Sequence, residues 1–291
     1  MADTITVLAN VSVLVFVVSS MLAMGLSLTV KQIVDPLRDI KLVLLALLAN
    51  FVLVPLVAYL IRLIIPLDEA FGIGLILLAT AAGAPFLPKL AQAAKGNIAF
   101  SVGLMVLLMV VTVVYVPIVL PLLLPGVSVN PLDIASSLIV LMLIPLGVGL
   151  FIRARYAETA MSLQPLFAQA SSTALLFVFG FMMLLNWRTI LGTIGSGALI
   201  AAVLFIAISL AIGYFLASRD PGMRSVSGLG TAQRNVSAAM VVAAGNFSDP
   251  NVLVMILIGA LLMLVILMPL GGELGKQQAA MAPAAAGEDH P

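Results

Sequence analysis

The ten residues Gly228-Leu229-Gly230-Thr231-Ala232-Gln233-Arg234-Asn235-Val236-Ser237 put an arginine and a cluster of hydrogen-bonding groups inside an otherwise apolar stretch, 223–244. About 20 mostly apolar residues are enough to cross the hydrocarbon core of a bilayer, which is roughly 30 Å thick. Glycines and polar groups at that depth are tolerated where a helix is interrupted against protein or a cavity. The sequence therefore predicts a broken transmembrane helix with a polar site at the break.

The composition of the whole chain agrees with a membrane setting. The 291 residues are 63% hydrophobic and 9% charged, whereas a soluble domain carries roughly 25% charged residues. We therefore expect the lipid bilayer to surround the protein. The sequence contains no cysteine, and its one histidine, His290, is next to last. We expect neither an enzyme nor a cofactor, and the net charge of +1 gives no reason to expect a nucleic-acid partner.

Nine stretches are long and apolar enough to span a membrane. The first four residues lack the basic region of a cleavable signal peptide, so we expect the first stretch to remain as a span. The sequence predicts an all-α membrane protein with about nine transmembrane helices. They are residues 5–28, 40–62, 70–94, 98–124, 132–153, 164–186, 190–217, 223–244 and 250–271.

The basic residues predict the orientation of these helices. The loops after the first, third, fifth and seventh stretches, with the C-terminal flank, hold nine lysines and arginines, and the opposite loops hold only Arg62 and Arg188. Because cytoplasmic loops are enriched in basic residues, we expect an external N-terminus, a cytoplasmic C-terminus and a place in the inner cell membrane. The two remaining basic residues, Lys89 and Arg234, lie inside stretches.

The third and eighth stretches share one pattern. Gly83, Pro85 and Pro88 interrupt the third, which closes on Gly96-Asn97, and the eighth closes on Gly245-Asn246. Glycine before asparagine predicts a helix end, because glycine adopts the left-handed conformation without a Cβ penalty. The two ends lie 149 residues apart (246 − 97).

That spacing pairs stretches one to four with stretches six to nine. The odd stretch between them turns the second copy upside down, as in transporters built from inverted repeats with one broken helix in each half. We expect a first repeat at residues 1–131, a second at 132–272, and a disordered cytoplasmic tail at 273–291.

Arg234 is the most informative single residue. It lies ten positions beyond Arg224 (234 − 224), which corresponds to ~15 Å of helix and a position near the middle of the bilayer. A charge there is costly unless it faces a partner or a polar cavity. The acidic residues lie in loops, at the ends of stretches or in the tail. The expected partner is a backbone carbonyl, a helix dipole or an anionic substrate, and the first of these would make Arg234 only a structural lock.

The remaining candidate site residues are less decisive. Lys89 is six positions from Lys95, so it either reaches the interface along its apolar stem or faces the same site as Arg234. Thr231 and Asn235 are expected on one face of a helix, and Gln233 and Ser237 on another, from their spacing of four. These four residues either line the substrate site or join helices as polar contacts.

Three segments resemble the bile acid:sodium symporter superfamily. They are Met24-Gly25-Leu26-Ser27-Leu28, the run from Gly83-Ala84-Pro85 to Lys95-Gly96-Asn97-Ile98-Ala99-Phe100-Ser101, and Gln233-Arg234-Asn235 with Asn246-Phe247. The resemblance implies a panel domain beside a core domain in which two broken helices cross. This chain looks like the nine-span kind, which lacks the first helix of ten-span members.

The resemblance also implies sodium ligands, and this sequence departs from them. The family's Ser-Asn pair falls on Leu87 and Pro88, and its glutamate on Gly230. Its Gln-Asn pair falls on Arg234-Asn235, or its glutamine on Gln233 if one residue is skipped. Ser101 is the only match to a family sodium ligand, so a sodium cofactor is doubtful.

The predicted function is a secondary transporter that moves a small organic anion, bile-acid-like or a small carboxylate, by alternating access and without sodium. A fixed cation replaces a bound sodium electrostatically when the substrate is an anion. Two alternatives stay open at this point: a sodium-coupled symporter with a relocated ion site, and a non-transporting sensor or scaffold with the carrier fold. The oligomeric state does not follow from the sequence.

Overall fold

The computed structural model describes residues 2–124, 130–192, 195–217 and 220–285. These residues form helices joined by short connections, with no strand among them, so the expected all-α class is confirmed for the described part of the chain. Five helices within it are long and apolar enough to cross a membrane. They are Ile40–Ile64, Ile98–Leu123, Pro131–Arg155, Ala198–Leu216 and Pro250–Ala280. A total of nine spans stays a prediction.

The first part of the chain contains one continuous helical segment with a widened turn and one interrupted helix. The order is α1 (Ala2–Ser27), α2 (Val30–Val34), η1 (Asp35–Arg38), α3 (Ile40–Leu48), η2 (Ala49–Leu53), α4 (Val54–Ile64), α5 (Glu69–Thr80), α6 (Leu87–Ala93) and α7 (Ile98–Leu123). The third stretch was expected to break at Gly83, Pro85 and Pro88; the interruption between α5 and α6 contains Gly83 and Pro85, and Pro88 lies in the first turn of α6.

The second part also contains one helical segment with a widened turn and, further along the chain, one interrupted helix. Its elements are α8 (Pro131–Leu138), η3 (Ile139–Leu143), α9 (Ile144–Arg155), α10 (Ala157–Gly192), α11 (Ala198–Leu216), α12 (Pro221–Ala232), α13 (Val236–Asn246) and α14 (Pro250–Ala285). The second interruption lies between α12 and α13, inside the segment 228–237 that was expected to contain a break.

Each π-helical turn, η2 and η3, precedes a proline. Proline has no N–H to donate to the carbonyl four residues earlier, and its ring crowds that carbonyl, so the preceding turn widens. Before Pro55 the carbonyl left over is that of Phe51, and the Tyr115 hydroxyl of α7 donates to it at 2.6 Å. The widened turn carries Asn50, whose side chain is fully buried.

The structure confirms both predicted helix ends, since α6 ends at Ala93 and α13 ends at Asn246, but the expected left-handed glycines are wrong. The left-handed residue after α6 is Lys95, with φ +51°, and not Gly96; Asn97 instead caps α7 by accepting from the N–H of Phe100. Gly245 lies inside α13 in a helical conformation. The repeat pairing that was counted from these glycines stays a prediction.

The expected disordered tail at 273–291 is also wrong as far as Ala285, because α14 continues to that residue; residues 286–291 lie outside the described part. The extension is helical because it docks on the interrupted helices. Gly275 packs against the end of α6, where a Cβ would lie 3.2 Å from the carbonyl carbon of Ala94. The Gln278 amide donates to the Ser225 hydroxyl of α12 at 2.7 Å.

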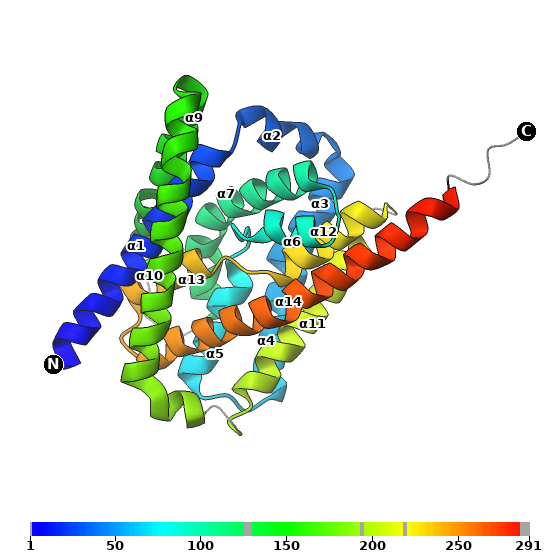
Figure 1. Cartoon of the computed structure of the whole chain (residues 1–291). Coiled ribbons are helices and arrows are strands. Elements are labelled where there is room, and N and C mark those ends of the chain that lie inside the picture. Colours follow the sequence, from blue (N-terminus) through cyan, green and yellow to red (C-terminus); the bar gives the residue numbers. More distant parts are fainter. Residues whose placement is uncertain (1, 125–129, 193–194, 218–219, 286–291) are drawn as a thin grey trace, which may run out of the picture.

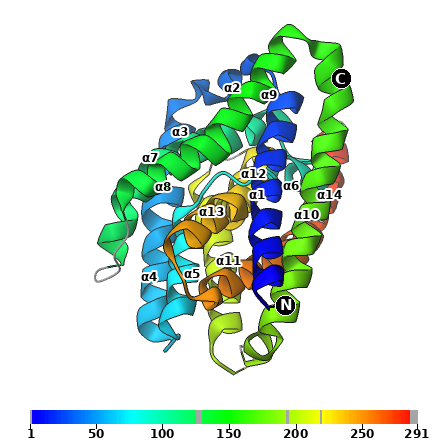
Figure 2. The same cartoon turned by 90° about the vertical axis from the view of Figure 1, so that its left-hand side faces the viewer.

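The helices form two groups in space. Figure 1 shows α1, α9 and α10 together on the left, while α14 runs diagonally across the front of the remaining helices. In the view turned by 90° α1 lies in front, with α10 beside it (Figure 2). Gly149 lets α9 approach α1 closely, since a Cβ there would lie 2.7 Å from the carbonyl oxygen of Leu22. This grouping resembles the expected panel and core, whose boundaries stay a prediction.

Candidate functional site

The first interruption is a short extended segment after Thr80. Gly83 has φ +81° and lies so close to α7 that a Cβ would come 2.6 Å from the Cα of Met109. Thr112 of α7 supplies hydrogen-bond partners for the backbone of the broken helix. Its hydroxyl donates to the carbonyl of Ala82 at 3.1 Å and accepts from the N–H of Ala82 at 3.0 Å. Glycine and threonine together make an interruption possible inside a buried core.

The second interruption covers Gln233, Arg234 and Asn235. α12 ends at Ala232, and Asn235 caps the next helix by accepting from the N–H of Ala238 at 3.0 Å. Because a side-chain oxygen at this position satisfies a free helix N–H, Asn235 fixes where α13 begins. The backbone N–H of Arg234 donates to the sulfur of Met263 in α14 at 3.2 Å.

The two interruptions lie directly against each other. The backbone N–H of Asn235 donates to the carbonyl of Ala81 at 2.8 Å. The side-chain amide of Asn235 donates to the carbonyl of Gly83 at 3.0 Å. Asn235 is fully buried, so these bonds satisfy polar groups that have no access to water. Residues about 150 positions apart in the sequence therefore form one polar centre.

Arg234 lies in that centre with none of its surface exposed. Its Nε donates to the carbonyl of Leu78 at 3.0 Å, and its Nη2 to the carbonyl of Ala79 at 2.7 Å. Its Nη1 donates to the carbonyl of Thr231 at 3.1 Å and to Oδ1 of Asn50 at 2.7 Å. These bonds use four of the five N–H groups of a guanidinium.

The electrostatic partner of Arg234 is a pair of helix ends. Leu78 and Ala79 belong to the last turn of α5, and Thr231 to the last turn of α12. Carbonyls in the last turn of a helix have no N–H partner within the helix and carry the negative end of its dipole. The ion pairs among the described residues, Arg38 with Asp35 and Lys276 with Glu273, lie at exposed positions. Of the three partners expected for Arg234, the structure shows carbonyls and helix dipoles.

Asn50 of η2 also belongs to this centre. Besides accepting from Arg234, its amide donates to the hydroxyl of Thr231 at 3.2 Å and to the carbonyl of Ala46 at 3.0 Å. The sequence argument did not single out Asn50 or Thr112. The available signal was one amide in the middle of the apolar stretch 40–62, and a threonine in the middle of 98–124.

The other predicted residues are distributed around this centre. Thr231, Gln233, Asn235 and Ser237 are all buried. Their expected helical faces are wrong, because the helix stops between Ala232 and Val236 and a spacing of four no longer aligns side chains. The Oε1 of Gln233 has no hydrogen-bond partner among the described residues. Ser237 lies 3.5 Å from the hydroxyl of Ser20 in α1.

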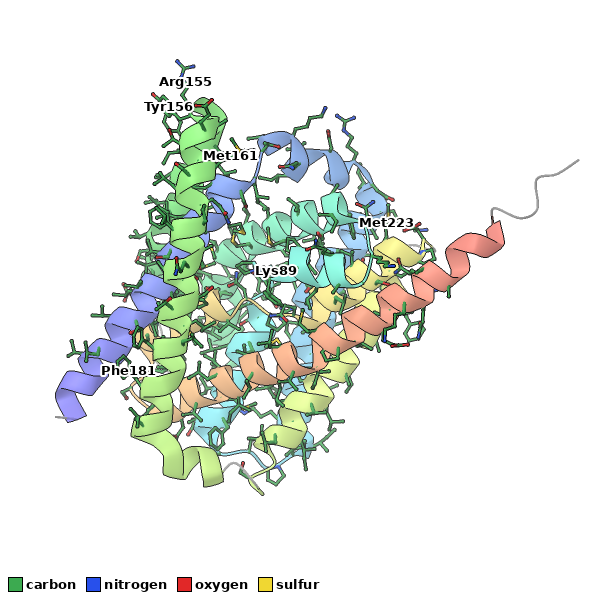
Figure 3. All side chains as sticks on the ribbon, in the orientation of Figure 1. Lys89, Arg155, Tyr156, Met161, Phe181 and Met223 are labelled. Atoms are coloured by element: carbon green, nitrogen blue, oxygen red, sulfur yellow. The ribbon has the colours of Figure 1, made fainter. Side chains whose placement is uncertain are left out.

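Lys89 is separate from the centre and accessible. It projects from α6 as an exposed side chain, and its Nζ lies 5.7 Å from the ring centroid of Phe86. Figure 3 shows it near the middle of the bundle in that view. Lys89 is exposed, Arg234 is enclosed, and the two share no hydrogen-bond partner among the described residues. Ser101 is buried in α7, where its hydroxyl donates to the carbonyl of Ile98 at 2.6 Å.

A sodium ion fits poorly at the polar centre. The oxygens that converge there, from Leu78, Ala79, Thr231 and Asn50, already surround a guanidinium. A second cation beside it would face like charge at close range. The described residues contain no group of three acidic, histidine or cysteine side chains arranged to hold a metal.

Two interrupted helices that cross inside an apolar helical bundle, with their ends joined around a buried charge, define a polytopic membrane protein of the carrier type. Residues 13–193 match the Sodium Bile acid symporter family. The chain belongs to this family. It is also similar to the Probable sodium/metabolite cotransporter BASS3, chloroplastic, of Arabidopsis thaliana, with 25% identity over 207 residues. That match covers 70% of this chain and 47% of the relative, so the chain spans about half the length of the protein it matches.

Proposed function

We propose that the protein is a secondary carrier for a small organic anion, bile-acid-like or a small carboxylate, that works by alternating access and does not need sodium. The observation that carries this proposal is the guanidinium of Arg234, which bonds the C-terminal ends of both α5 and α12. A tethered cation occupies the place where helix ends attract positive charge. It stays when the substrate leaves, so it cannot store the energy of an ion gradient.

Lys89 is the proposed contact for the substrate. Arg234 is fully enclosed and has most of its donors engaged, so its direct contact with a substrate stays a prediction for another conformation. Lys89 is exposed and lies beside the ring of Phe86. An ammonium next to an aromatic face suits an anion that also has an apolar part. Gln233 and Ser237 remain candidate contacts, as predicted from the sequence.

The proposed setting is the inner cell membrane, with the N-terminus outside and the C-terminus cytoplasmic. The proposed architecture is two inverted repeats, residues 1–131 and 132–272, with α1, α8, α9 and α10 as a panel beside the core. Movement of one group against the other around the crossing would expose the site alternately to each side.

Uptake by the purified protein in liposomes tests the proposal. A set of labelled small carboxylates and a bile acid is offered with a sodium gradient and with potassium in its place. We expect equal uptake of at least one substrate in both. Lys89→Gln should weaken its affinity about ten- to a hundredfold, the value of one charge-assisted hydrogen bond. Lys95→Gln is the matched control, since Lys95 is also exposed and lies just past the end of α6.

A sodium-coupled symporter is the second candidate. The names of the family and of the chloroplast relative favour it, and Ser101 keeps one matching ligand. The same assay separates the two, because uptake that stops in potassium would overturn the sodium-independent carrier. Failure of every substrate in both buffers would favour a sensor or scaffold.

A further inference from the structure

Basic residues lie at one end of the bundle, where membrane-crossing helices begin and end. The span Pro131–Arg155 ends on an arginine, and Lys41 is the second residue of the span Ile40–Ile64. Figure 3 shows Arg155 and the neighbouring Tyr156 at the tip of α9, and Figure 1 shows α2, which follows α1, at the same end. Tyr156 is exposed, and tyrosine is enriched at the level of lipid headgroups. This end of the protein therefore lies at headgroup depth.

Positive charge exceeds negative charge at this end. Residues 30–41 and 153–158 hold five basic and three acidic side chains. Lys31 of α2, Lys41 of α3 and Arg155 of α9 are exposed, and none of them forms an ion pair within the described part of the chain. Of the two acidic residues between the lysines, one pairs with an arginine of η1 and the other caps α3. The three basic side chains are therefore available to an anion.

Exposed apolar side chains lie next to the two lysines in sequence. Val30 and Val34 of α2 are 61% and 51% exposed, and Ile40 at the start of α3 is 70% exposed. Ile33 is partly buried against the core, because α2 packs on α7. A short basic segment with an exposed apolar side is typical of helices that lie in the membrane interface. A soluble phosphate leaves these side chains uncovered, whereas a phospholipid offers a charged headgroup and acyl chains together.

We propose that this end of the protein binds anionic phospholipids, with Lys31, Lys41 and Arg155 at the headgroup phosphates and Val30 and Val34 against the acyl chains. Basic residues near a membrane surface are attracted to negatively charged headgroups. The planar guanidinium of an arginine holds a phosphate through two parallel N–H bonds, and a lysine acts as a point charge. This inference does not depend on the proposed transport activity, because it concerns only the rim of the bundle.

Thermal unfolding in a neutral detergent tests this binding. Phosphatidylglycerol is titrated into the purified protein, with phosphatidylcholine and water-soluble glycerol 3-phosphate as separate arms at the same concentrations. A ligand that binds only the folded state raises the unfolding temperature, and we expect phosphatidylglycerol alone to do so. An equal rise with phosphatidylcholine means that acyl chains suffice, and an equal rise with glycerol 3-phosphate means a site for a free phosphate. Either result, or no rise with any of the three, overturns the proposal.

Variants that remove charge locate the bound lipid. Each basic residue near an anionic surface contributes about fivefold in affinity. Combining Lys31→Gln, Lys41→Gln and Arg155→Gln should therefore lower the affinity for phosphatidylglycerol at least about tenfold. The unfolding temperature without lipid should stay the same, because all three side chains are exposed.

Lys276→Gln is the matched control for these variants. Lys276 is also exposed, but it belongs to the C-terminal part of α14, which Figure 1 shows on the far right, away from α9. Its loss should change the affinity less than twofold. If the triple variant does not fold, the three single variants carry the same comparison, with about fivefold expected for each. A triple variant, or every single variant, that binds phosphatidylglycerol like the wild type overturns the proposal, as does an equal loss in Lys276→Gln.

Discussion

The Nη2 of Arg234 lies 2.7 Å from the carbonyl oxygen of Ala79, so a side chain from the second interruption closes the end of the helix that leads into the first. The same guanidinium also bonds Thr231 at the end of its own half-helix, α12. One positive charge is thus fixed where two helix C-termini converge, and its partners are dipoles and an amide. This arrangement links the stability of the crossing to its electrostatics.

Removing the guanidinium should destabilise the fold. In Arg234→Gln the carbonyls of Leu78, Ala79 and Thr231 lose their donors, and each buried acceptor left unpaired costs about 1–3 kcal/mol. We expect a loss of about 3 kcal/mol or more, and a smaller loss for Arg234→Lys, which keeps the charge but not the planar fork. Thermal unfolding in detergent measures both variants.

Arg224→Gln is the control for that comparison. Arg224 is only partly buried, and its Nε makes one long bond of 3.4 Å to the carbonyl of Tyr214. Its loss should cost far less. If Arg234→Gln unfolds at the wild-type temperature, the guanidinium does not hold the crossing together.

Thr112→Val should loosen the first interruption. Valine has the same shape without the hydroxyl, so both backbone groups of Ala82 lose a partner supplied by another helix. We expect a cost of about 1–3 kcal/mol in the free energy of unfolding. Thr80→Val is the matched control, because the buried hydroxyl of Thr80 bonds only carbonyls of its own helix. Equal effects of the two changes would argue against a special role for Thr112.

Truncation of α14 should depend on where it is made. Ending the chain after Gly272 removes Gly275 and Gln278, which dock on α6 and α12. We expect lower thermal stability and poor expression from that variant. Ending it after Ala280 keeps both contacts and should leave stability near the wild type. Identical behaviour of the two truncations would mean that the docked extension contributes nothing.

The sequence predicts several residues of the site but not which groups they contact. Arg234 inside an apolar stretch, with no acid available, predicts that carbonyls, dipoles or a substrate must meet it, and the structure shows carbonyls and dipoles. Which carbonyls they are depends on how the interrupted helix α5–α6 crosses the interrupted helix α12–α13, and that contact leaves no trace in local sequence. Asn50 could not be singled out from the sequence for a related reason. A lone amide in a membrane helix usually joins helices, and only the crossing makes it a neighbour of Arg234.

The wrong expectations about the shared helical faces and about the tail have a different cause. At both places tertiary contacts overrode the local signals of the sequence. The pattern Thr231-x-x-x-Asn235 aligns two side chains only in a continuous helix, and the bonds from Asn235 to Ala81 and Gly83 stop the helix before it. The tail after Gly272 has no periodic apolar face, yet glycine at 275 and glutamine at 278 suffice to dock it. Contacts of this kind are not visible in composition.

Asn50→Asp separates the charge of the centre from its packing. The substitution keeps the size and shape of the side chain and puts a carboxylate oxygen where Oδ1 of Asn50 now lies, 2.7 Å from Nη1 of Arg234. The fixed positive charge then gains a buried counter-charge, while the guanidinium keeps its bonds to Leu78, Ala79 and Thr231. The amide bonds to the Ala46 carbonyl and to the Thr231 hydroxyl are lost. The hydroxyl is able to donate to the carboxylate instead, so one acceptor is left unpaired at a cost of about 1 kcal/mol, and the new ion pair offsets it. We expect thermal stability close to that of the wild type.

The same variant tests whether the fixed charge serves an anionic substrate. If it does, neutralising the centre should lower the affinity for that substrate, or its uptake, about tenfold or more, and sodium should still have no effect. Binding and uptake are measured on protein that elutes as a folded species, with Asn50→Ala as the comparison that removes the amide without adding charge. An Asp variant that is folded and transports as well as the wild type would show that Arg234 serves only as a structural lock.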